Sequence, residues 1–494
     1  MAVVLALDAG TTGIRAMAID ETGQPVAWAY REFPQHFPRP GWVEHDASDI
    51  WDATQATLAD VVAALDGTAI AAIGITNQRE TAVAWDRRTG APKHRAIVWQ
   101  DRRTAVQCDQ FRAAGHLDAI RERTGLVLDA YFSATKWEWM VTEGGVTTDG
   151  QLALGTVDSW VIWNLTSGGA FVTDPSNASR TLAYDIEQRA WSDELCELFG
   201  VPRHALPEVC VSSGDIAKVG AGMPIPEGTP ICGIAGDQQA ALFGQVCFAP
   251  GEAKNTYGTG SFVLLNAGST PPPRAEGLLT TVAWELERPA RFTYALEGAI
   301  FVTGAAIQWL RDGLGIIKDA AEVGPLAESI PDTEGVYFVP ALTGLGSPQW
   351  DPYARGTIVG LTRGSGRAHL ARAVVESMAY ATRDVVEAMS ACAGVDLRGL
   401  RADGGASVMD LLMQIQADQL NVPVTRPSIQ ETTILGAAYL AGLGAGVWSS
   451  LDEIKGLWKE EARFEPVASR SGPDARHAGW QRAVDRSRNW ARPD

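Results

Sequence analysis

Apolar residues at the start of the chain fall into two short runs that are separated by a polar turn. The first run, residues 3–7, ends at Asp8, and the second follows Arg15 and ends near Ile19. Short apolar runs bounded by glycine-rich turns are typical of buried β-strands. The pattern therefore predicts a β-hairpin with a Gly-Thr-Thr-Gly turn at residues 10–13 and a carboxylate beside that turn.

A second unit of the same kind lies in the middle of the chain. Residues 255–265 read NTYGTGSFVLL, which is again a turn of glycine and threonine followed by an apolar strand. The stretch FAPGE at residues 248–252 interrupts the pattern just before this unit. A chain of 494 residues exceeds the usual size of one domain. We therefore predict two domains, residues 1–247 and residues 248–494.

Other elements are predicted from periodicity and capping. A helix that Asp46 or Ser48 can cap extends to Leu65, and residues 369–389 form a long amphipathic helix. Apolar strands are expected at residues 69–75 and near residues 231–234, and each leads directly into polar residues. Polar residues that follow a buried strand are common active-site positions in α/β proteins.

One uncharged segment is long enough to cross a membrane. It extends from Thr432 to Leu451 and contains several glycines, among them Gly442 and Gly444. Its glycine content and its Ser449-Ser450 end favour a closely packed buried helix that ends near one of those glycines. We predict a helix in the protein core here, and no membrane span.

Composition and charge narrow the classes of function. Hydrophobic residues make up 46% of the chain, charged residues make up 20%, and the formal net charge is -18 without a basic block. Such a surface disfavours nucleic acids and anionic membranes as partners. The six cysteines show no metal-binding spacing, and the N-terminus lacks the basic start of a signal peptide. We expect reduced thiols and a cytoplasmic protein.

Several polar groups at turns and strand ends suggest ligand chemistry. Glycines allow close approach of an anion to the two turns, threonines add donors, and Asp8 could hold hydrated Mg²⁺. For the first hairpin alone, an ordinary structural turn is the stronger interpretation. Arg79 and Glu80 could bind hydroxyl groups, although local sequence favours a surface ion pair. Trp99 lies at a similar strand end, where a pocket wall and a core position are equally supported.

Asp237 follows a short apolar strand and precedes a helix. That corner would suit a general base that takes a hydroxyl proton, and it would equally suit a helix N-cap. Farther along the chain, Gly404 and Gly405 form another strand-to-helix corner, where the backbone could approach a flat ring.

The order of these segments resembles the FGGY carbohydrate kinases of the actin/hexokinase-like superfamily. The resemblance extends from Leu5 to about Trp480 and implies an α/β fold of two ribonuclease-H-like (actin-like ATPase) domains with a cleft between them. Its most specific segments are GITNQRET (74–81), AIVWQDRRT (96–104), YFSATK (131–136), GTVDSWVIW (155–163), NASRT (177–181), GIAGDQQAALFGQ (233–245), NTYGTGSF (255–262) and WDPYARG (350–356).

Within that family the chain is similar to members that phosphorylate glycerol with ATP and Mg²⁺ to give sn-glycerol 3-phosphate. The resemblance implies Asp237 as the general base and Asp8 as the Mg²⁺-associated carboxylate. It assigns Arg79, Glu80, Trp99, Tyr131, Asp237, Gln238 and Phe262 to the polyol, and Thr11, Thr12, Gly13, Arg15, Thr259, Gly304, Gln308, Gly405 and Met409 to the nucleotide.

The chain departs from the family pattern at four positions. Ala9 stands where the family has glutamine, Gly13 where it has serine, and Met409 where it has asparagine, so two amides and one hydroxyl are missing. Gly228 occupies the position of an arginine that binds fructose 1,6-bisphosphate in some bacterial members. We therefore expect no inhibition by that sugar phosphate.

Alternative functions remain open from the sequence alone. One is a kinase of the same family that acts on another small polyol or a ketose. A second is a non-catalytic, regulatory relative, and a third is an actin-like or chaperone-like ATPase without a polyol pocket. In each case we expect a homo-oligomer, either a dimer or a tetramer.

Overall fold

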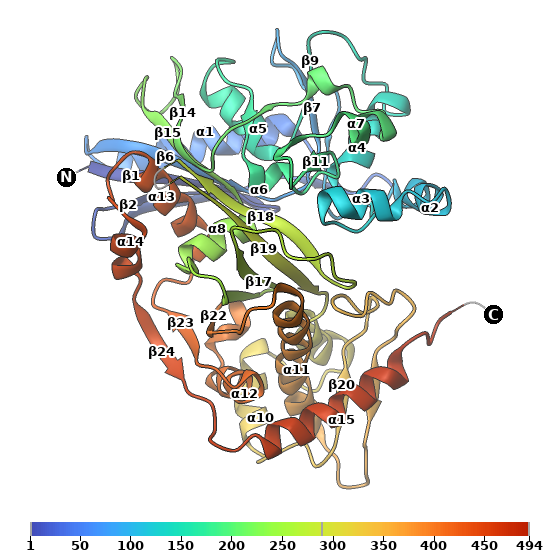
Figure 1. The fold of residues 1–494 in the computed structure, drawn as a ribbon. Coiled ribbons are helices and arrows are strands. Elements are labelled where there is room, and N and C mark those ends of the chain that lie inside the picture. Colours follow the sequence, from blue (N-terminus) through green and yellow to red (C-terminus); the bar gives the residue numbers. More distant parts are fainter. Residues whose placement is uncertain (1, 288–289, 493–494) are drawn as a thin grey trace.

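The computed structural model describes residues 2–287 and 290–492, and within them one 13-stranded sheet passes through the whole molecule (Figure 1). The mixture of this sheet with helices on its faces confirms the α/β prediction. In spatial order, the strands of the sheet are β24 (Glu460–Phe464), β23 (Val424–Pro427), β22 (Gly399–Asp403), β16 (Glu252–Tyr257), β17 (Ser261–Gly268), β19 (Arg291–Ile300), β18 (Leu279–Leu286), β14 (Ser213–Lys218), β15 (Pro230–Gly236), β6 (Ala69–Asn77), β1 (Ala2–Ala9), β2 (Gly13–Ile19) and β3 (Pro25–Glu32).

Two parts of the sheet repeat the same topology. In β3-β2-β1-β6-β15, three antiparallel strands are followed by two strands that run parallel to β1. The order β19-β17-β16-β22-β23 has the same pattern around β16. The repeat agrees with two related halves. The boundary at residues 247 and 248 itself stays a prediction, because strands from both sides of it join one sheet through β14 and β18.

Both predicted hairpins are present. β1 and β2 pair antiparallel from Val4 opposite Ile19 to Ala9 opposite Ile14, and β16 and β17 pair in the same way around residues 258–260. The smaller strands lie outside the main sheet. They are β4 (Gln35–His36), β5 (Glu44–His45), β7 (Val83–Asp86), β8 (Ala96–Ile97), β9 (Leu152–Gly155), β10 (Val172–Thr173), β11 (Tyr184–Asp185), β12 (Ala190–Trp191), β13 (Glu208–Val209), β20 (Tyr337–Val339) and β21 (Thr357–Val359).

The predicted helices are confirmed, with small changes at their ends. Asp46 caps the first helix by accepting a hydrogen bond from the amide of Ser48, and the helix expected at 369–389 is two residues longer at its start and four at its end. The helices are α1 (Ala47–Ala64), α2 (Ala105–Ala113), α3 (Leu117–Thr124), α4 (Ser133–Thr142), α5 (Val157–Leu165), α6 (Pro175–Ala178), α7 (Asp193–Leu198), α8 (Asp237–Gly244), α9 (Gly304–Gln308), α10 (Val323–Glu328), α11 (Arg367–Ala393), α12 (Asp410–Leu420), α13 (Thr432–Gly444), α14 (Leu451–Leu457) and α15 (Ser471–Ser487).

Strand β1 is buried on both faces, as its continuous apolar run requires. Leu5 and Leu7 pack with side chains of α1 and α5, whereas Val4 and Ala6 belong to a second core that contains α8 and α13. Successive side chains of a strand point to opposite faces, so these two cores lie on opposite sides of the sheet. Asp8 continues the series of Val4 and Ala6 and therefore points to the side of α8 and α13.

Helices α8 and α13 lie between the two halves of the sheet. Their core also includes Leu264 and Ala295 from the strands of the second half. Figure 1 shows that α13, although it comes late in the chain, lies beside β1 and β6, and its contacts with both strands and with α8 agree. The predicted buried helix is thus confirmed, and it ends at Gly444. No helix in the described part of the chain is long and apolar enough to span a bilayer.

Glycine permits the close approach of α13 to its neighbours. A methyl group at Gly436 would lie 1.8 Å from the carbonyl oxygen of Ala240 in α8. A methyl group at Gly74 in β6 would lie 2.0 Å from the carbonyl oxygen of Ala437. Backbone therefore packs directly on backbone at these crossings, and no other residue fits without moving an element.

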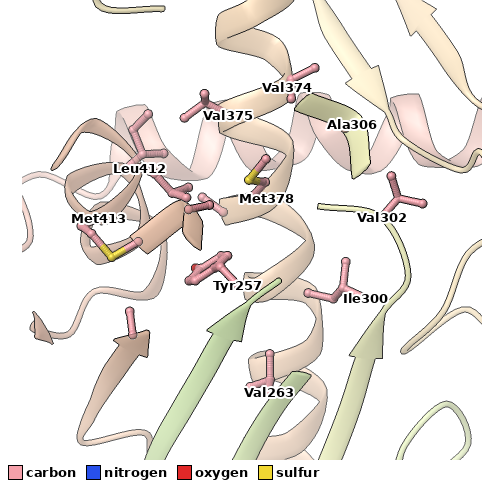
Figure 2. Close-up of a cluster of buried hydrophobic side chains, with 14 of the residues drawn as sticks. Tyr257, Val263, Ile300, Val302, Ala306, Val374, Val375, Met378, Leu412 and Met413 are labelled. Atoms are coloured by element: carbon pink, nitrogen blue, oxygen red, sulfur yellow. The ribbon is translucent and has the colours of Figure 1, made fainter. Parts of the chain in front are cut away.

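A separate hydrophobic core packs around the strand end that leads into the second turn. Figure 2 shows Tyr257, the residue before that turn, among side chains of β17, β19 and α11, including Val263, Ile300 and Met378. The Tyr257 hydroxyl donates a hydrogen bond of 2.7 Å to the side-chain oxygen of Gln416. This packing fixes the strand end from which residues 258–260 project.

Replacing Gly436 by alanine should destabilise the fold. Overpacking a well-packed core costs about 1–3 kcal/mol, and the contact here is with backbone, which cannot rotate away. We expect Gly436→Ala to unfold at a clearly lower urea concentration than the wild type. Gly456→Ala is the matched control, because no atom lies within 4 Å of the added methyl group in α14. Equal unfolding midpoints for the two variants would contradict the role assigned to this crossing.

Candidate active site

Three parallel strands bring charged residues to one edge of the sheet. β1, β6 and β15 lie side by side and run in the same direction. Asp8 is near the end of β1, Arg79 follows β6, and Asp237 follows β15. The carboxyl ends of neighbouring parallel strands form a common edge, where ligands usually bind in open α/β sheets.

Arg79 and Glu80 belong to a buried network of four charges. Arg79 donates to the carboxylate of Glu297 at 2.5 and 3.2 Å. Arg180 donates to Glu80 at 2.6 Å and to Glu297 at 3.0 Å. All four side chains are at most 2% exposed, so the expectation of a surface ion pair is wrong. We call these residues the charged quartet.

The quartet shifts the ionisation of its two acids in different directions. Burial alone disfavours both carboxylates, but Arg180 and Arg79 outweigh it at Glu297 and lower the pKa of that residue to about 2. At Glu80 burial outweighs the same two arginines, and the pKa is raised. Glu297 is therefore the anion that fixes the position of both guanidinium groups.

Asp237 pairs with Arg79 and is more exposed to solvent than the quartet. The Nε atom of Arg79 is 3.2 Å from Oδ1 of Asp237, and about a third of the Asp237 side chain (32%) is exposed. Gly236 takes the N-cap position of α8, so Asp237 is its first residue and is not the N-cap. Burial raises the pKa of Asp237, while Arg79 and Lys254 oppose that shift. The carboxylate is thus accessible and held in place, as a proton acceptor requires.

Aromatic side chains line the same region. The Trp99 and Tyr131 rings meet edge to face, with centroids 5.7 Å apart. The Tyr131 hydroxyl accepts a long hydrogen bond of 3.5 Å from Arg79. Trp99 also donates from its indole nitrogen to the hydroxyl of Thr11 at 3.0 Å, which links this wall to the first turn. Phe262 is half-buried on β17 and packs against the core that contains α8.

Asp8 on β1 and Asp237 after β15 lie on either side of β6, which separates their two strands in the sheet. Burial and the charge of Asp237 raise the pKa of Asp8 to about 7, and Arg15 only partly opposes this. A like charge disfavours the ionised form of a carboxylate, and a cation beside it favours that form. The described residues contain no cluster of three or more metal-binding side chains. Asp8 and Asp237 fit Mg²⁺ because this ion keeps several waters and uses one or two carboxylates besides phosphate oxygens.

The first turn presents donors that the fold leaves open. A hydrogen bond of 3.0 Å from the Gly10 amide to the Gly13 carbonyl closes the turn. Thr12 is exposed at its tip, and Arg15 has a buried Nε atom without a hydrogen-bond partner in the described chain. Ala9 is buried in the core with α1, on the face opposite Asp8. The amide missing at Ala9 therefore lies on the face of the sheet opposite to Asp8 and Arg15.

The second turn packs on the start of α9. The Gly258 amide donates to the Gly260 carbonyl at 2.8 Å, and Thr259 is exposed. A methyl group at Gly304 would lie 2.6 Å from the Gly258 carbonyl oxygen, so only glycine fits there. Gly304 is thus explained by packing, and its predicted contact with a nucleotide stays a prediction.

The remaining nucleotide candidates lie on different elements of the second half. Gln308 is exposed at the end of α9, and Gly405 is exposed with no atom within 4 Å of an added methyl group. Met409 is half-buried and packs beside Gly324 of α10. The roles of these three residues in adenosine binding stay predictions.

Three further residues at the site were not among the predicted set. Arg180 and Glu297 complete the quartet, and Lys254 is fully buried beside Gln238 and Thr256, to which its ammonium group donates at 2.5 and 2.9 Å. Burial lowers the pKa of Lys254 to about 8. The available signal for Glu297 was an acidic residue inside a mostly apolar strand, whose other charged residue, Arg291, stands at its start. Its partners could not be read from the sequence, because they lie 117 and 218 positions away.

Comparison with known proteins gives matches along nearly the whole chain. Models of the N-terminal and C-terminal domains of the FGGY family of carbohydrate kinases match residues 3–244 and 253–445. A glycerol kinase of Chromobacterium violaceum is 52% identical and one of Trichlorobacter lovleyi 53% identical. The alignments cover 99% and 100% of this chain and 98% and 100% of those proteins.

Solved structures agree with these matches. Plasmodium falciparum glycerol kinase, solved with ADP, superposes with a TM-score of 0.94 at 35% identity, covering 99% of this chain and 98% of that one. A xylulose kinase from Lactobacillus acidophilus has a TM-score of 0.88 at 22% identity, with 99% of each chain covered, and shares the fold.

Replacing Glu297 by glutamine should lower the free energy of unfolding far more than a substitution at the surface. Removing one partner of a buried ion pair typically destabilises by about 3–5 kcal/mol, because the other charges stay buried. Glu387→Gln is the control, since Glu387 pairs with Arg383 on α11 but is 53% exposed, and we expect a change below about 0.5 kcal/mol. Urea denaturation at neutral pH measures both, and similar losses for the two would contradict the importance of the quartet.

The contribution of Glu297 should also depend on pH. Its pKa in the folded protein, about 2, lies below its ordinary value of 4.5. The stabilisation is therefore complete above pH 4.5 and is lost as the pH falls toward 2. The difference in unfolding free energy between the wild type and Glu297→Gln should shrink over this interval. A difference that stays constant down to pH 2 would show that Glu297 is not an ionised partner.

Proposed function

Because the chain belongs to the FGGY family of carbohydrate kinases, we propose that it transfers the γ-phosphoryl group of ATP to glycerol, giving sn-glycerol 3-phosphate. The full-length glycerol kinases at 52% and 53% identity support this choice of acceptor over a ketose. The observation that carries the proposal is the pairing of Arg79 with Asp237 at 3.2 Å, next to Tyr131 and Trp99.

This arrangement suits a small polyol. Glycerol offers three hydroxyl groups on a short carbon chain, so its site needs several hydrogen-bonding groups and an apolar wall. Arg79 supplies donors, Asp237 supplies an acceptor, and the rings of Trp99 and Tyr131 supply the wall. Glu80 is held by Arg180 and can accept from a second hydroxyl with the carboxylate oxygen that Arg180 leaves open. Gln238 and Phe262 extend the same surface from α8 and β17.

Asp237 acts as the general base in the proposed reaction. It takes the proton of a primary hydroxyl as that oxygen bonds to the γ-phosphorus and the bond from phosphorus to the β–γ bridging oxygen breaks, so that ADP leaves. Arg79 favours the ionised carboxylate against the effect of burial and orients it before the acceptor binds. The ion pair also prevents rotation of the side chain, which keeps the acceptor oxygen aligned with the bond that breaks.

The nucleotide phosphates would lie between the two turns. Thr11, Thr12 and Arg15 offer donors on one side, and Thr259 offers its hydroxyl and amide on the other. Asp8 would hold Mg²⁺, which supplies neutralisation of phosphate charge when it is bound. Burial and Asp237 raise the pKa of Asp8 to about 7, and a cation bound beside it would favour the ionised carboxylate.

The protein is also proposed to work in a reducing compartment such as the cytoplasm. All six cysteines are free, and burial raises the pKa of several of their thiols, which keeps them unreactive. An assembly as a dimer or tetramer stays a prediction.

Asp237→Asn should abolish most turnover without unfolding the protein. Asparagine has nearly the same shape but cannot accept a proton, and loss of a general base lowers kcat by about 10²–10⁴-fold. Asp312→Asn is the control, because Asp312 is 63% exposed and pairs only with Arg311 among the described residues. Steady-state assays with saturating ATP and glycerol compare them. Turnover near the wild-type rate in Asp237→Asn would refute the assignment of the base.

A panel of acceptors tests the substrate. We expect ATP turnover with glycerol to exceed that with xylulose, gluconate and other polyols by at least about tenfold in kcat/KM, because a site built for a three-carbon chain leaves no room for a longer one. A coupled assay for ADP measures every acceptor under the same conditions. A higher kcat/KM with a ketose would contradict glycerol as the substrate. ATP binding without turnover of any acceptor would favour a regulatory protein.

A further inference from the structure

The outermost strand of the sheet brings an unassigned hydroxyl to the first turn. Tyr30 on β3 is opposite Arg15 on β2, and Arg15 is opposite Asp8 on β1. Residues that are directly opposite in neighbouring strands point to the same face. Tyr30, Arg15 and Asp8 therefore form a row on the face of the sheet that also carries Gly13 and that lies on the side of α8 and α13.

The Tyr30 hydroxyl fills the space next to Gly13. A methyl group at Gly13 would lie 2.7 Å from the Tyr30 oxygen and 2.5 Å from the carbonyl oxygen of Arg31. No side chain fits at residue 13 in this arrangement, so the turn lacks a side-chain hydroxyl of its own at that place. The phenol oxygen stands there instead, 3.3 Å from the hydroxyl of Thr12.

The surroundings of Tyr30 are suited to an anion. The Arg15 guanidinium lies 5.6 Å from the centre of the Tyr30 ring, and its Nε atom is buried without a hydrogen-bond partner in the described chain. Two carboxylates face the Arg15 guanidinium: Glu431, which is 3.7 Å away and 42% exposed, and Asp8, which is opposite Arg15 on β1 and whose ionised form Arg15 favours. Tyr30 itself is 39% exposed, so its hydroxyl is available to a ligand. A phenol and a threonine hydroxyl beside an arginine are three donors in one place.

We propose that the Tyr30 hydroxyl is a phosphate-binding group of the nucleotide site and takes the place of the side-chain hydroxyl that Gly13 lacks. The inference rests on the proposed function, since it places the polyphosphate of a nucleotide at the first turn. Tyr30 and the hydroxyl of Thr12 donate to the same phosphate group, and Arg15 balances its charge. Strand β3 thereby contributes directly to nucleotide binding, and does not merely cover the edge of β2.

Tyr30→Phe tests this with the loss of one oxygen atom. The ring and its contact with Arg15 remain, so the strand should fold as before. We expect the Kd of ATP and of ADP, measured by calorimetry, to rise about 10-fold, as for one hydrogen bond to a charged acceptor. The Kd of adenosine, which has no phosphate, and the KM of glycerol should not change. Tyr353→Phe is the matched control, because Tyr353 is equally exposed (41%) and its described contacts lie near α15, away from both turns.

Two other outcomes overturn the inference. Equal ATP affinity in Tyr30→Phe and the wild type would mean that the hydroxyl does not contact phosphate. Parallel losses for ATP, adenosine and glycerol would mean that Tyr30 only supports the fold. If the wild type binds ATP but turns over no acceptor, the proposed function fails, while the calorimetric comparison still decides the role of Tyr30.

Discussion

The charged quartet is the interaction on which the positions of Arg79 and Glu80 depend. Moving four charges out of water costs several kcal/mol for each ion unless they are paired with good geometry. Here each guanidinium bonds to a carboxylate, and Glu297 on β19 serves Arg79 and Arg180 together. The bonds join the loop after β6 to a strand of the other half. The quartet therefore holds Arg79 in the orientation in which it pairs with Asp237. In the proposed reaction, this preorganised pair would need little further reorganisation.

The crossing of α8 and α13 determines where Asp237 lies. Asp237 is the first residue of α8, so its position relative to Asp8 follows from where this helix lies. Gly436 lets α13 rest on the backbone of Ala240, and Gly74 lets α13 rest on β6. Glycine at these two positions therefore sets how closely α13 can approach α8 and β6. Each half of the molecule contributes to the core around these helices, which makes the two carboxylates sensitive to how the halves pack.

Strand β3 illustrates how a local departure from the family pattern can be offset by a neighbour. Gly13 lacks a side chain because Tyr30 and the Arg31 carbonyl occupy the space. In the sequence of the turn by itself, Gly13 is the loss of a side-chain hydroxyl. The register of β2 and β3, with Arg15 opposite Tyr30, returns a hydroxyl to the same place from seventeen residues farther along the chain.

The sequence by itself determined the two hairpins, the main helices, the buried character of α13 and the family, because each depends on local periodicity, capping or motif order. Asp8, Arg79 and Asp237 were also identified from the sequence, since each follows or ends an apolar strand. Only the tertiary structure decided that Arg79 and Glu80 are buried, that Glu297, Arg180 and Lys254 surround them, and that Tyr30 reaches the first turn. The physical reason is that these contacts join residues far apart in sequence, and their burial and charge depend on how the strands order themselves in one sheet.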